Sequence, residues 1–63
     1  MKIQDTQAFK AMDGVQQKVA VQNRSTINHS ALLLKNVGTE RWEKLSNHLP
    51  NRWKNIVKEL AAV

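Results

Sequence analysis

Apolar side chains recur at helical spacing along almost the whole of this chain, and that periodicity predicts an all-α protein. No repeat or Pro/Gly-rich linker divides the sequence, and its only proline and two glycines are typical of breaks between helices. The pattern is sharpest over residues 51–62, where apolar and polar residues fall on opposite sides of a helix. We therefore expect a small helical bundle in which an N-terminal helix precedes three further helices.

The chain is short and lacks cysteine, and both facts limit how it can be stabilised. With 63 residues it is expected to form a single helical domain over residues 1–63. The core of so small a domain rarely contributes more than roughly 3–5 kcal/mol. Because no disulfide can add to that, we expect the two tryptophans, Trp42 and Trp53, to be structural anchors.

The first predicted helix is an accessory element over residues 5–22. Asp5 or Thr6 can cap its N-terminus. Gly14 weakens the helix by about 1 kcal/mol relative to alanine, so its existence is favoured more strongly than its continuity. Its apolar positions share one side and are expected to pack on the rest of the molecule: Ala8, Phe9, Met12, Val15 and Val19.

The second predicted helix follows the polar stretch 23–26 and is expected to be the most buried element. Ser25 or Thr26 can cap it, and Gly38 ends it in the usual C-terminal position. One face carries Ile27, Ala31 and Leu34. Further apolar residues widen that face until the helix is apolar nearly all round: Leu32, Leu33 and Val37.

The third and fourth predicted helices are separated by Pro50. Thr39 is expected to cap the third, Glu40 and Lys44 are spaced for an ion pair, and the buried stripe is Trp42, Leu45 and Leu49. Asn51 is expected to cap the fourth helix, which runs to about Ala62. Its apolar stripe consists of Trp53, Ile56, Val57 and Leu60.

No group of residues in this sequence favours catalysis, a metal site or a cofactor site. Acid–base and nucleophilic chemistry need titratable groups that converge, and here five carboxylates are scattered, with no cysteine, tyrosine or glycine-rich phosphate loop. His29 and His48 lie far apart, and neither has a metal-ligand neighbour at helical spacing. We therefore expect a binding protein, not an enzyme, with no metal and no cofactor.

The charge distribution points to a partner rich in phosphates. The formal net charge is +5, and residues 23–63 hold seven basic and three acidic side chains. The polar side of the fourth helix carries lysine and asparagine, which suit phosphates and base edges respectively: Asn51, Lys54, Asn55 and Lys58. Glu59 follows Lys58 directly and is expected to oppose phosphate approach at that surface.

Residues 33–52 resemble the middle of a Myb/SANT repeat. An apolar helix ends at Gly38, Arg41 and Trp42 open the next helix, and Leu49-Pro50-Asn51-Arg52 takes the place of the Leu-Pro-Gly-Arg turn into the third helix of that family. The resemblance covers about residues 24–62. It implies a homeodomain-like, helix-turn-helix unit of three helices, in which Lys58 matches a base-reading lysine of the family's third helix.

Two hypotheses about function follow. In the first, the protein is a small DNA-binding transcriptional regulator that places its C-terminal helix in the major groove of duplex DNA. The contacting residues are then Asn51, Arg52, Lys54, Asn55 and Lys58, with Arg41 and Lys44 approaching phosphates.

In the second hypothesis, the chain is a protein-binding helical module, such as a phage- or plasmid-type inhibitor or an adaptor. It would hold a partner protein, or a second copy of itself as a homodimer, through apolar residues of the first helix or through Trp53. Under either hypothesis we expect no membrane partner and an intracellular protein, cytoplasmic in a prokaryote or phage and nuclear in a eukaryote.

Overall fold

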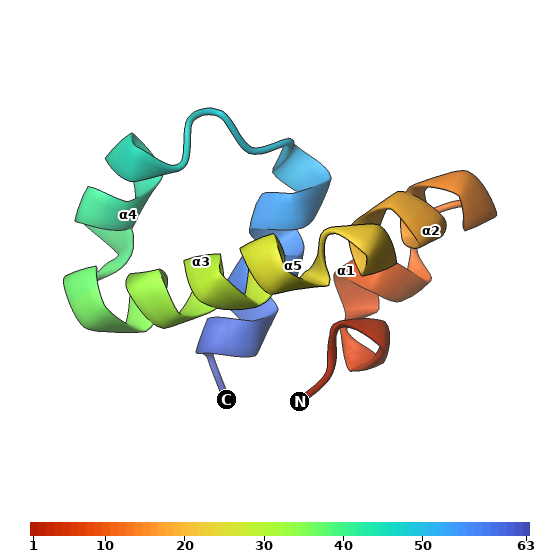
Figure 1. The fold of residues 1–63 in the computed structure, drawn as a ribbon. Helices are drawn as coiled ribbons and strands as arrows, with labels where there is room; N and C mark the ends of the chain where they lie inside the picture. The colour runs from red at the N-terminus through yellow and green to blue at the C-terminus, as the bar shows by residue number, and fades with distance from the viewer.

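The computed structural model describes residues 1–63 as helices joined by short connections, with no strand (Figure 1). This confirms the prediction of a small all-α bundle. α3 lies across the molecule, α5 packs against it, and α1 also packs against α5. The elements are η1 (a 3₁₀ turn, Ile3–Asp5), α1 (Gln7–Lys10), α2 (Gly14–Gln22), α3 (Arg24–Val37), α4 (Thr39–Leu45) and α5 (Asn51–Ala61).

The single helix predicted over residues 5–22 is two helices, and the break lies just before Gly14, the residue expected to weaken its continuity. α1 begins after Thr6, whose hydroxyl accepts a hydrogen bond from the Phe9 amide at 3.2 Å, as the capping prediction required. The chain then breaks after Lys10, and Asp13 starts α2 by accepting a hydrogen bond from the Gln16 amide at 2.8 Å. A good N-cap directly before a glycine favours a new helix start over continuation of the old one.

Asn23 joins α2 to α3, and the expected caps at residues 25 and 26 are wrong. The side-chain amide of Asn23 donates to the Val19 carbonyl at 2.8 Å, and the backbone carbonyl of Asn23 accepts from the Ile27 amide at 3.1 Å. The same residue therefore ends one helix and begins the next. Because α3 starts already at Arg24, Ser25 and Thr26 lie inside its first turn and cannot cap it.

Gly38 ends α3, as predicted, and also begins α4. Its φ of +85° with ψ 163° belongs to a region that essentially only glycine occupies. Its amide donates to the Leu34 carbonyl, and its carbonyl accepts from the Trp42 amide, both at 3.0 Å. Thr39 is consequently the first residue of α4 and makes no capping hydrogen bond, so its predicted role is wrong.

A turn over residues 46–49 connects α4 to α5. Pro50 precedes the first residue of α5 in an extended conformation, and its carbonyl accepts from the Trp53 and Lys54 amides at 3.0 Å. Asn51 is already helical and makes no capping hydrogen bond, so the expectation that it caps α5 is wrong. Proline provides the fixed φ at the helix entry, and no side chain caps the helix.

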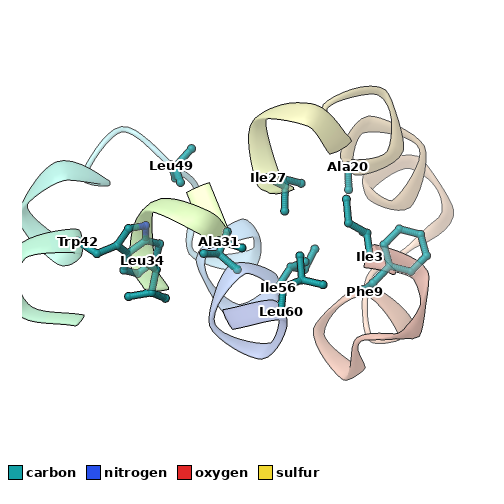
Figure 2. Close-up of a cluster of buried hydrophobic side chains, with 11 residues drawn as sticks. Ile3, Phe9, Ala20, Ile27, Ala31, Leu34, Trp42, Leu49, Ile56 and Leu60 are labelled. Carbon is teal, nitrogen blue, oxygen red and sulfur yellow. The ribbon is translucent and has the colours of Figure 1, made fainter. Parts of the chain in front are cut away.

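One continuous core runs through the bundle, and α5 lies at its centre. Figure 2 shows the buried side chains in a row from Trp42 and Leu34 at one end to Ile3 and Phe9 at the other. Trp42 is completely buried, and its indole nitrogen donates to the Ser30 hydroxyl at 3.0 Å. The remaining members of the core are Ala20, Ile27, Ala31, Leu49, Ile56, Val57 and Leu60.

Three apolar residues that the periodicity assigned to buried stripes are exposed. Val15 on α2 is 70% exposed, Leu32 on α3 is 60% exposed and Leu45 on α4 is 48% exposed. α3 contacts α2, α4 and α5, and those neighbours leave one of its sides uncovered. The expectation that α3 is buried nearly all round is therefore wrong, because so small a bundle has no further layer to cover it.

Candidate nucleic-acid interface

The apolar stripe of α5 determines which of its polar residues face solvent. Ile56 and Val57 are completely buried, and Leu60 is buried beside them. At roughly 100° of rotation per residue, the opposite side of the helix carries Asn51, Asn55 and Lys58. All three are exposed, and Lys54, at the edge of the same side, is half-buried. The structure thus brings together four of the predicted contact residues on one helix face.

The polar face of α5 has two edges with different neighbours. Lys58, at the α4 edge, forms an ion pair with Glu43 at 3.1 Å, and both side chains are about half exposed (47% and 43%). Exposed pairs of this kind contribute only about 0–1 kcal/mol, so a phosphate can compete for the lysine. Arg52 is exposed at the opposite edge of the face, and Glu59 lies on the same side of α5 as Arg52.

Glu59 is turned away from Lys58 and towards the N-terminus of α1. Its two carboxylate oxygens accept hydrogen bonds from the Gln7 amide at 2.8 Å and the Ala8 amide at 2.7 Å. Glu59 is therefore held at α1, and its expected opposition to phosphate approach stays a prediction. Sequence reasoning missed this role because the partners are 51 and 52 residues apart, and no local pattern reports such a contact.

The segment that contains this face has no acidic residue. Residues 44–58 include four basic side chains and no carboxylate. The carboxylates that bound the segment are both engaged, Glu43 with Lys58 and Glu59 with the amides of α1. A cation-bearing stretch without a free carboxylate provides the positive potential that attracts a phosphate backbone.

The two predicted phosphate contacts on α4 are placed differently from the α5 face. Arg41 and Lys44 are exposed, and with Val37 and Glu40 they line a shallow hollow. On α4, Arg41 lies roughly 160° around the helix from Glu43, the residue that reaches α5. The structure therefore does not bring Arg41 to the α5 face. Glu40 and Lys44 do not form the predicted ion pair, since Glu43–Lys58 is the only salt bridge.

Trp53, the residue proposed to hold a partner protein, packs partly against the core. Its side chain is half-buried, and its indole nitrogen is buried without a hydrogen-bond partner. Of the first predicted helix, Phe9 is buried, Met12 is half-buried against the core and Val15 is exposed. Neither feature presents a broad apolar patch to solvent.

Other kinds of site have little support in the structure. His29 and His48 are both exposed, and no group of three His, Asp or Glu residues is placed to hold a metal ion. None of the helices has the length and apolar character needed to cross a bilayer.

Comparison with known proteins provides no relative from which a function could be transferred. No family model matches the sequence, and no curated protein and no solved structure matches it either. The resemblance to the Myb/SANT family stays a prediction from the sequence. What supports a function is therefore the charge and exposure of the residues themselves.

Proposed function

We propose that this protein binds duplex DNA through the exposed face of α5 and acts as a small transcriptional regulator. The observation that supports the proposal is the acid-free segment 44–58, whose two bounding carboxylates are occupied within the fold. A partner that approaches α5 meets lysine, arginine and asparagine side chains, and the two carboxylates that bound the segment, Glu43 and Glu59, already have partners within the fold. Phosphates and base edges are the groups that such side chains recognise.

Each residue has a distinct role in this proposal. An α-helix with its side chains is about 10–12 Å across and fits the major groove, which is about 12 Å wide. Arg52 and Lys54 contact phosphates, and Asn51 and Asn55, in the first two turns of α5, face base edges. Lys58 exchanges Glu43 for a phosphate when DNA binds.

The test is a titration of fluorescently labelled duplex DNA at several salt concentrations. Each true phosphate contact contributes a slope of about −0.9 to log K against log salt, so Lys54→Ala should weaken binding and reduce the slope by about 0.9. Asn55→Ala should instead reduce preference between sequences and leave the slope nearly intact, because a base-edge contact releases no counterion.

The matched control is Lys18→Ala, which removes an exposed lysine from α2 and changes the net charge equally. It should leave the salt slope close to that of the wild type. Equal weakening by the Lys18 and Lys54 variants would show that binding follows net charge and not the α5 face, and no salt-dependent binding at low ionic strength would exclude the proposal.

A further inference from the structure

A second surface, separate from the polar face of α5, exposes apolar side chains. Leu32 on α3 is 60% exposed, and Met1 and Val63 are exposed at 63% and 68%. These three side chains line one hollow with Ala31, Leu60 and two polar residues of α3, Asn28 and Lys35. We call this the Leu32 surface.

The hollow continues along α3 into a neighbouring one. The second hollow shares Met1 and Asn28 with the first and extends it to Arg24, Val21 and residues 2–4. Arg24, Asn28, Leu32 and Lys35 follow one another at helical spacing and so form a single stripe. The first hollow measures about 280 Å³ and the second about 310 Å³, just below and just above the lower limit of the roughly 300–1,000 Å³ of small-molecule pockets, and they suit individual side chains better than a cofactor.

The charges around this groove have one sign. No acidic side chain lines either hollow, and residues 14–39, which include all of α2 and α3, contain no carboxylate at all. Arg24 and Lys35 stand at the two ends of the stripe, and Lys2 lines the second hollow. Two acidic residues are adjacent in sequence to lining residues, and both have partners: Asp5 accepts a hydrogen bond from the Lys2 amide at 3.3 Å, and Glu59 accepts from the amides of α1.

We propose that the Leu32 surface docks an acidic amphipathic helix of a partner protein. Its apolar side chains would cover Leu32 and fill the two hollows, and its flanking carboxylates would pair with Arg24 and Lys35. The twelve residues from Arg24 to Lys35 span about 16 Å of α3, which corresponds to roughly three turns of a docked helix. Apolar anchors within a charged rim are the usual composition of such an interface.

Charge complementarity selects this occupant over a second copy of the chain. A symmetric pairing through the Leu32 surface would place the cationic stripes of two molecules, each with a net charge of +5, against one another with no acidic side chain among the lining residues. Nucleic acid fits no better, because its phosphates would have to lose water over the apolar side chains of Met1, Leu32 and Val63.

Three synthetic helical peptides of about 14 residues test this proposal. They share one leucine stripe and carry glutamate, glutamine or lysine at the flanking positions. Each is added to the isotope-labelled protein, and the backbone amides are followed by NMR. The glutamate peptide should shift the amides of residues 24–35 and 60–63, the glutamine peptide should bind about tenfold more weakly, and the lysine peptide should not bind.

Variants at exposed positions locate the site without disturbing the core. Leu32→Glu should weaken binding of the glutamate peptide by about tenfold or more, as loss of a central anchor does. Val15→Glu is the matched control, because Val15 on α2 is also an exposed apolar residue (70% against 60% for Leu32), and this variant should bind the peptide like the wild type.

Three results would overturn the proposal. The first is equal binding by the Leu32→Glu variant, and the second is a set of peptide-induced shifts confined to residues 51–58. The third is movement of the Leu32-surface amides on dilution of the protein alone, which would assign the surface to self-association. None of these outcomes depends on DNA binding, so the two proposals can fail separately.

Discussion

Trp42 and Leu45 show what periodicity can and cannot predict about a single residue. Both were expected in one buried stripe, yet Trp42 is completely buried and Leu45 is 48% exposed. Helical spacing identifies the side of α4 that faces the core. It does not report how far the neighbouring elements extend, and α4 contacts mainly α3. The large residue nearest that contact is covered, and the residue one turn later is not.

We expect Trp42→Ala to unfold the protein or come close to it. Truncation of a buried tryptophan costs about 3–5 kcal/mol, comparable with the total of about 3–9 kcal/mol expected for a chain of this length. Ser30→Ala tests its hydrogen bond separately, because it leaves the indole N–H without a partner at a cost of about 1–3 kcal/mol. Urea denaturation followed by tryptophan fluorescence and circular dichroism measures both. Unchanged midpoints would contradict the assignment of Trp42 to the core.

Glu59 provides a second prediction about one side chain. Its carboxylate accepts two backbone hydrogen bonds as an N-cap does, so Glu59→Ala should cost about 0.5–2 kcal/mol. Amide hydrogen exchange should become faster at Gln7 and Ala8 and stay unchanged at Lys58. If Glu59→Ala instead strengthens DNA binding without loss of stability, Glu59 acts at the α5 face and not at α1.

The helices themselves were easier to predict than the residues that begin them. α3 and α5 lie where apolar periodicity, Gly38 and Pro50 placed them, and α4 begins after Gly38 as predicted but ends at Leu45, before Leu49 and Pro50. The predicted caps at Thr39 and Asn51 were wrong because the preceding residue in each case, Gly38 or Pro50, already has the non-helical backbone conformation of an N-cap. Thr39 and Asn51 are therefore the first helical residues of α4 and α5, where their side chains make no capping hydrogen bond. Thr6 caps α1 because no such neighbour precedes it.

The two glycines provide a matched pair of substitutions. Gly38→Ala should destabilise the protein by more than about 1 kcal/mol, because its φ of +85° strains any residue with a Cβ, although no atom lies within 4 Å of that position. Gly14→Ala also meets no atom within 4 Å, and its φ is not positive. It should therefore stabilise α2 by about 0.4–1 kcal/mol. Urea midpoints of the two variants should move in opposite directions, and movement in the same direction would contradict this explanation.

The arrangement of the whole molecule could be predicted only in part, because its decisive contacts join distant segments. The acid-free run 44–58 can be read in the sequence, and the two-sided pattern of α5 predicts which of its residues face out. That Glu43 and Glu59 are occupied by Lys58 and by α1 depends on how the helices pack. The Leu32 surface was missed for the same reason, since a side left uncovered by tertiary packing has no sequence pattern of its own.

The N-terminal segment is expected to be essential for the stability of the bundle. Residues 1–13 contribute Ile3 and Phe9 to the core, and burial of each is worth about 1.5–3 kcal/mol. The same segment covers one side of α5 and provides the amides that Glu59 binds. Removal of residues 1–13 should therefore abolish the cooperative thermal transition seen by circular dichroism. A double variant of the full chain, Ile3→Ala with Phe9→Ala, should reproduce most of that loss. If residues 14–63 alone melt like the full chain, α2 to α5 form a core that is stable without the N-terminal segment.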